Sequence, residues 1–124
     1  MLTGDALTSR IIGSAIEVHR HLGPGLLESA YEQCLCHELT GIGLPHARQV
    51  ALAVVYKDIQ IDLALRADII VAEEVLIELK SVERLLPVHE AQVLTYLRLT
   101  RYRLALLINF NVLRLKDGLR RLVA

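Results

Sequence analysis

The chain of 124 residues has the size of one ordinary folded domain, large enough to bury a core and too short for two. It has no net charge at pH 7, and hydrophobic residues make up 53% of it, a high share for a globular protein. No apolar run approaches the roughly 20 residues that cross a bilayer, and no signal-like stretch opens the chain, which excludes an integral membrane protein. We therefore expect one cytoplasmic domain over residues 1–124, with part of its apolar surface buried in a homodimer.

The zero net charge hides an uneven distribution along the chain. Residues 1–83 carry 6 Lys and Arg against 12 Asp and Glu, a net charge of −6, and residues 84–124 carry 8 against 2, a net charge of +6. A basic C-terminal third could contact nucleic-acid phosphates while acidic residues upstream hold a cation. Two solvated faces of a neutral protein would give the same pattern, so charge alone leaves both interpretations open.

The first third of the chain has the apolar spacing of helices. Apolar residues recur at intervals of three and four in residues 7–22 and 27–42, which predicts two amphipathic helices. Gly23-Pro24-Gly25 separates them, and Pro45 prevents the second helix from resuming.

From residue 50 the apolar period changes to two, the period of strands. The predicted strands are residues 50–56, 59–65, 66–71 and 75–80. Lys57-Asp58 can form the first turn, and the third strand can be a continuation of the second. A loop of three residues, Ala72-Glu73-Glu74, joins the last two strands as a hairpin.

The C-terminal part predicts a helix and then a buried strand. Helical spacing follows Pro87 over residues 89–100, and residues 103–110 are almost all apolar, as in a central strand covered on both faces. A helix between two such strands predicts a parallel crossover. Asp117-Gly118 predicts a hairpin in the tail. The fold class that follows is α/β, with a central mixed β-sheet flanked by helices.

Glu78 and Lys80 are the most informative charged pair in the sequence. Residues i and i+2 of a strand share a face, so this strand presents a carboxylate and an ammonium together. Charged residues in the middle of a β-rich run cost free energy unless they are paired or functional. A surface ion pair on an exposed face of the sheet is the alternative explanation.

The loop length brings Asp68 into this group. With a loop of three residues, Val71 pairs with Val75, and counting inward places Asp68 opposite Glu78 on the same face. Two like charges in direct opposition destabilise a sheet unless a cation lies between them. Oxygen ligands of this kind favour Mg²⁺ or Mn²⁺. The Leu79 carbonyl can add a ligand, and Lys80 can orient water or offset phosphate charge, a combination suited to phosphodiester hydrolysis.

Three residues of the third predicted helix can face the same site. His89, Gln92 and Tyr96 follow at intervals of three and four, although a helix surface with an ordinary core tyrosine would look the same. Glu28 lies in the first turn of its helix, where the helix dipole favours a carboxylate whatever its function.

These residues together resemble a known family. Gly25-Leu26-Leu27-Glu28-Ser29-Ala30-Tyr31 resembles the motif that names the GxxExxY family of the PD-(D/E)xK nuclease superfamily. The resemblance extends to residues 12–19, 66–68, 77–80, 87–92 and 107–110, and so covers nearly the whole chain. It implies a restriction-endonuclease-like core with a metal site at Asp68 and Glu78.

The resemblance also implies roles for single residues. Lys80 corresponds to the catalytic lysine and Glu28 to the acidic metal ligand on a helix. Gln92 and Tyr96 resemble the Q-xxx-Y motif of RecB-like nucleases, in which the glutamine positions the lysine and the substrate phosphate and the tyrosine contacts nucleic acid.

Nucleic acid, more readily DNA than RNA, is the expected partner. His89, Tyr96, Arg98 and Arg101 are the candidate contacts, because they lie on or next to the helix that carries Gln92. The leading hypothesis is a Mg²⁺- or Mn²⁺-dependent nuclease with Asp68, Glu78, Lys80 and Gln92 as catalytic residues. A non-catalytic nucleic-acid-binding or assembly module that keeps the fold is the alternative, because fold alone does not determine function.

Overall fold

The structure, a computed structural model, describes residues 4–124. The elements follow in this order: α1 (Gly4–Leu22), α2 (Glu28–Gly41), β1 (His46–Tyr56), β2 (Ile59–Val71), β3 (Val75–Lys80), α3 (Pro87–Leu99), β4 (Leu104–Asn109), the 3-10 helix η1 (Leu115–Gly118) and β5 (Leu119–Val123). Residues 59–65 and 66–71 form one continuous strand, β2, the simpler of the two arrangements that the sequence allows. No helix in this described part has both the length and the hydropathy needed to span a lipid bilayer.

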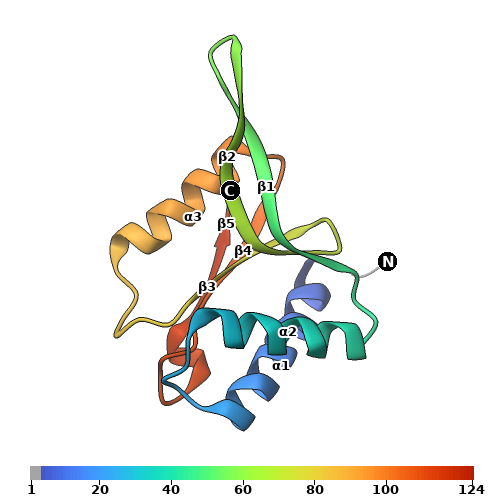
Figure 1. Ribbon diagram of the computed structural model, residues 1–124, viewed down its shortest axis with the longest axis vertical. Coiled ribbons are helices and arrows are strands. Elements are labelled where there is room, and N and C mark those ends of the chain that lie inside the picture. Colours follow the sequence, from blue (N-terminus) through green and yellow to red (C-terminus); the bar gives the residue numbers. More distant parts are fainter. Residues whose placement is uncertain (1–3) are drawn as a thin grey trace.

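The strands form one mixed sheet in the order β1-β2-β3-β4-β5. Neighbouring strands are antiparallel except β3 and β4, which run parallel and are connected through α3. The predicted parallel crossover is therefore confirmed. It places the C-terminal end of β3, which carries Glu78 and Lys80, near the N-terminal end of α3 (Figure 1).

Helices cover the sheet from both faces (Figure 1). α1 and α2 pack on one face, where the odd-numbered residues of β3 join their core: Val75, Ile77 and Leu79. α3 packs on the other face through Val93 and Leu97, which share a cluster with Leu76. Glu78 and Lys80 follow the parity of Leu76, so these two residues lie on the α3 face of the sheet.

The hairpin between β2 and β3 has the predicted loop and register. Val71 pairs with Val75, and the pairing continues to Ile69 and Ile77. The next pair inward would join Asp68 to Glu78, and the regular ladder stops there. The loop of three residues therefore sets the position of both carboxylates.

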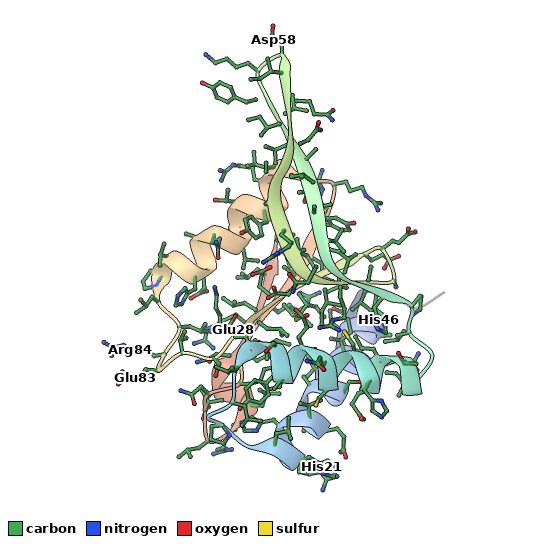
Figure 2. All side chains as sticks on the ribbon, viewed as in Figure 1. His21, Glu28, His46, Asp58, Glu83 and Arg84 are labelled. Carbon is green, nitrogen blue, oxygen red and sulfur yellow. The ribbon has the colours of Figure 1, made fainter. Side chains whose placement is uncertain are left out.

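The outer part of the β1–β2 hairpin, residues 53–64, extends beyond the body of the molecule (Figure 1). Asp58 lies at its tip (Figure 2). We call this part the outer ribbon. Its alternating apolar residues correctly predicted strands, yet Ile59, Ile61 and Leu63 are exposed because no helix of the described chain covers this ribbon.

The C-terminal tail differs from the predicted tight hairpin. Asp117 and Gly118 belong to η1, and β5 returns antiparallel to β4 after a long connection. The glycine is needed for a different reason: a Cβ at Gly118 would overlap the backbone carbonyl of Asn109. Close approach of two backbone segments, and not a two-residue turn, explains this glycine.

Candidate functional site

Asp68 and Glu78 each accept a hydrogen bond from a backbone N–H of the neighbouring strand, at the point where the β2–β3 ladder stops. The Leu79 N–H donates to Asp68 Oδ2 at 2.8 Å, and the Asp68 N–H donates to Glu78 Oε1 at 3.2 Å. Each carboxylate thus replaces a backbone acceptor of the regular ladder. The two acids lie next to one another, as the loop length predicts, and we call this arrangement the carboxylate clasp.

The clasp concentrates negative charge in a poorly solvated place. Glu78 is only 6% exposed, and its burial, together with the charge of Asp68, raises its pKa to about 7. Burial also raises the pKa of Asp68, although the Leu79 N–H bond acts in the opposite direction. No ion pair joins Glu78 to Lys80 among residues 4–124. A surface ion pair on an exposed sheet face, the alternative explanation for these charges, is therefore wrong.

The backbone polar groups of Leu79 and Lys80, at the end of β3, face opposite neighbouring strands. The Lys80 carbonyl accepts from the Phe110 N–H at 3.0 Å, so the backbone of Lys80 faces β4. The Leu79 N–H faces Asp68 on β2, and because the N–H and C=O of one strand residue point to the same side, the Leu79 carbonyl faces the clasp as well. In the described chain the Lys80 ammonium makes no hydrogen bond or ion pair, and it is available to a ligand.

A hollow of about 600 Å³ brings most of the predicted residues together. Its polar lining includes Glu28, Arg66, Asp68, Glu78, Lys80 and Tyr96, with Leu79 between the strand residues. Tyr96 lines the same hollow, where burial raises the pKa of its hydroxyl and the charges of Glu78 and Asp68 raise that pKa further. We call this space the carboxylate hollow.

Tyr31 explains how Glu28 comes to the carboxylate hollow. Its hydroxyl donates to the Gly23 carbonyl at 2.6 Å and accepts from the Leu26 N–H at 3.1 Å, which fixes the turn before α2. Its ring stacks on Phe110 with centroids 4.5 Å apart and planes 8° apart. The tyrosine therefore anchors the start of α2, where Glu28 is the first residue (Figure 2).

The same turn is tied to the segment that follows Lys80. The Ser81 hydroxyl donates to the Leu26 carbonyl at 2.6 Å. Asn109, which is 1% exposed, accepts from the Val82 N–H and donates to the Val82 carbonyl. These bonds tie the residues after Lys80 to the turn before α2 and to β4. They therefore fix the position of Lys80 relative to the start of α2.

Gln92 and His89 lie in a second hollow that shares Lys80 with the first. Helical spacing predicted that they share one site with Tyr96, whereas they border Lys80 without lining the carboxylate hollow. His89 also has a structural role, because its Nδ1 accepts from the Leu86 N–H at 2.9 Å and caps α3.

Arg98 and Arg101 do not line either of these two hollows. The Arg101 guanidinium lies over the Tyr102 ring, 4.8 Å from its centroid, at the opposite end of α3 from His89. Arg66 is the arginine that lines the carboxylate hollow. Strand parity does not predict this position, because Ala67 and Ile69, which are also two residues apart, pack in the cores on opposite faces of the sheet.

Sequence reasoning also missed a chain of contacts behind Asp68. Glu32, which is 5% exposed, pairs with Arg48 at 2.8 Å and accepts from Gln49 Nε2 at 2.5 Å. The same Nε2 lies 3.5 Å from Asp68 Oδ1. Glu32 follows Glu28 by one helical turn, and this spacing was a usable signal.

Comparison with known proteins is informative at the level of the superfamily. A family model described as the PD-(D/E)XK nuclease superfamily matches residues 5–122. The chain belongs to this superfamily. No curated protein and no solved structure matches the chain. The mixed sheet with helices on both faces agrees with the restriction-endonuclease-like fold of PD-(D/E)XK proteins, whose members are usually nucleases and generally use divalent metal ions such as Mg²⁺.

The donor atoms at the clasp fit the metal ions that PD-(D/E)XK nucleases use. No three His, Cys, Asp or Glu side chains within residues 4–124 are grouped closely enough to hold one ion, so Glu28 lines the hollow without completing such a set. Mg²⁺ does not require one, because it keeps several waters and binds through one or two carboxylates together with substrate phosphate. Asp68, Glu78 and the Leu79 carbonyl supply hard oxygen donors of the right kind.

Proposed function

We propose that this chain is a metal-dependent nuclease that hydrolyses phosphodiester bonds, in DNA rather than RNA. The carboxylate clasp carries the proposal. It keeps two carboxylates together in a buried place, at a cost in free energy that a structural role alone would not justify. A divalent cation held by Asp68, Glu78 and the Leu79 carbonyl would offset that cost.

Lys80 and Glu28, which line the carboxylate hollow, then have roles in the reaction. Mg²⁺ or Mn²⁺ bound there would supply a Lewis acid and lower the pKa of a water molecule. Lys80, whose ammonium makes no hydrogen bond or ion pair in the described chain, orients the attacking water or neutralises charge that develops on the phosphate. Glu28, the first residue of α2, lines the same hollow and would serve as the acidic residue of the helix through a metal-bound water, because its carboxylate is not grouped with Asp68 and Glu78 closely enough to share one ion directly.

The finer assignment to the GxxExxY family, with its Q-xxx-Y motif, belongs to the same proposal. Gln92 borders Lys80 in the second hollow and would hold the lysine or the phosphate, with His89 beside it. Tyr96 lines the carboxylate hollow and would contact the nucleic acid. Exposed apolar residues on several elements are compatible with a homodimer, which is also part of the proposal.

Substitution of Lys80 and Glu78 separates catalysis from metal binding. Lys80→Met keeps much of the side-chain length and loses the charge, so Mn²⁺ affinity should stay within a few fold while cleavage falls by at least ~100-fold. Glu78→Gln removes a ligand charge and should lose both properties. The measurement is Mn²⁺ calorimetry together with single-turnover cleavage of labelled DNA, with Lys116→Met as a matched lysine control outside both hollows.

The alternative, a non-catalytic nucleic-acid-binding or assembly module, predicts a different result. If Lys80→Met cleaves DNA at the rate of the parent chain, the proposed mechanism is wrong. If the parent chain binds DNA and Mn²⁺ but does not cleave, the binding module is the better description.

A further inference from the structure

The strand that carries Asp68 has an irregularity next to the carboxylate hollow. Leu52 on β1 pairs with Leu65 on β2, and the next regular pair is Val54 with Ile61. Two steps along β1 therefore correspond to four steps along β2, so residues 62–64 form a bulge. Bulges of this kind redirect a side chain and are frequent next to active sites.

Leu63, in the middle of the bulge, has a strained backbone and an exposed side chain. Its φ angle is +56°, in the left-handed region that residues other than glycine rarely adopt. Its side chain is 77% exposed, so packing within the described chain does not offset the strain. Backbone strain that no packing within the fold offsets is typical of positions that contact a ligand.

Leu63 lines the carboxylate hollow together with Lys80, Arg66 and Tyr96. One wall of the hollow thus comes from the bulge of β2 and another from α3. The two cations are suited to phosphate groups, whereas a leucine side chain is not. An apolar side chain next to a phosphate site fits the face of a nucleobase, which lies one sugar away from its phosphate.

We propose that the bulge presents Leu63 as an apolar wedge against an unpaired nucleobase next to the phosphate that the site acts on. Tyr96, on the α3 wall of the same hollow, offers an aromatic surface for the same strand. In an intact duplex both faces of each base are stacked, so the wedge selects single-stranded or locally opened nucleic acid. This inference rests on the proposed nuclease function and adds the substrate class.

The continuity of the bulge with the carboxylate hollow favours nucleic acid as the occupant over a second copy of the chain. An interface with a second copy of the chain would bury Leu63 and the other exposed apolar residues of the outer ribbon to a similar extent. One of these is Val55, which is 64% exposed and lies outside the hollow. The wedge requires Leu63 alone. Val55 is therefore the matched control.

The test measures binding of a fluorescent single-stranded oligodeoxynucleotide and of the matching blunt duplex by anisotropy, in EDTA so that nothing is cleaved. The parent chain should bind the single strand more tightly. Leu63→Ala should weaken single-strand binding by at least ~5-fold, because it removes most of the apolar surface that contacts the base, and leave duplex binding unchanged. Leu63→Met should restore the affinity, and Val55→Ala should stay within about two-fold of the parent.

Several results would overturn the proposal. They are equal binding of single strand and duplex by the parent chain, no binding of either, an unchanged affinity in Leu63→Ala, or an equal loss in Val55→Ala. A change of molar mass in light scattering for Leu63→Ala, with unchanged affinity, would assign the bulge to a second copy of the chain. Because no turnover is measured, failure here is distinct from the loss of cleavage that tests Lys80.

Discussion

Glu78 is the residue whose protonation should most affect the fold. Its pKa in the folded protein is about 7, against an ordinary value of 4.5, because burial and Asp68 both disfavour the charged form. The folded state therefore holds this proton more tightly than the unfolded chain. The resulting stabilisation is complete below about pH 4.5 and is lost as the pH rises through about 7, by at most roughly 3 kcal/mol.

We therefore expect the metal-free protein to lose stability between about pH 5 and about pH 8, measured as thermal midpoints in EDTA. Glu78→Gln should remove most of this slope, because glutamine does not titrate. Asp68→Asn should move the slope to lower pH, because the charge of Asp68 raises the pKa of Glu78. An unchanged slope in Glu78→Gln would show that another group is responsible.

At the scale of single residues, strand parity was enough to predict that Asp68 and Glu78 lie together. The loop of three residues placed Asp68 beside Glu78, and the i, i+2 rule placed Lys80 on the same face. Gln49 was not predictable in this way, because its backbone lies in the left-handed region at φ +51° and leaves the strand period. Parity holds only where the strand is regular.

At the scale of elements, Gln49 marks a break in the pairing of β1 with β2. Arg48 pairs with Ile69 and Val50 with Ala67, while Gln49 lies opposite Asp68 and contacts it through its side chain. Its amide also binds Glu32, so it connects α2 to the clasp. We expect Gln49 to orient Asp68 for metal binding, as residues behind metal ligands commonly do.

Two substitutions distinguish this positioning role from a structural one. Gln49→Ala and Gln49→Gly both remove the amide, so both should lower Mn²⁺ affinity by about 10-fold in calorimetry. Only glycine relieves the left-handed strain, so Gln49→Gly should be the more stable of the two by about 1 kcal/mol. Gln60→Ala, which removes a contact with Asp62 in the outer ribbon, should leave Mn²⁺ affinity unchanged. If affinity instead followed stability across the variants, Gln49 would be structural only.

The three α-helices and the strands β1 to β4 were predictable, whereas the 3-10 helix η1 and the path from β4 to β5 were not. Apolar periods of 3.6 and 2 predicted the helices and the strands, and the run from residue 103 predicted the buried strand β4. The connection from β4 to β5 was predicted wrongly. Glycine is required at position 118 because the backbone of Asn109 lies against it, and no local sequence pattern reveals a contact nine residues away.

At the scale of the whole molecule, the outer ribbon is separate from the core. The helices bury both faces of the sheet elsewhere, but most of residues 53–64 are exposed. Alternation of apolar residues predicts a strand and does not tell whether another layer covers it. The core and the clasp therefore depend little on the tip of this hairpin.

Shortening the outer ribbon tests this independence. Val55 pairs with Gln60 and Tyr56 with Ile59, so deletion of these four residues removes two cross-strand pairs and keeps Lys57-Asp58 as the turn. The bulge and the clasp stay in register. We expect the free energy of unfolding to change by less than about 1 kcal/mol, because these side chains are exposed. Mn²⁺ should stabilise the shortened chain as much as it stabilises the parent.

Leu65→Ala, at the buried base of the ribbon, should by contrast lower the free energy of unfolding in urea by roughly 2–5 kcal/mol. A shortened chain that unfolds as readily as Leu65→Ala would place the tip within the cooperative core, and a fall in molar mass on shortening would identify the ribbon as the homodimer contact.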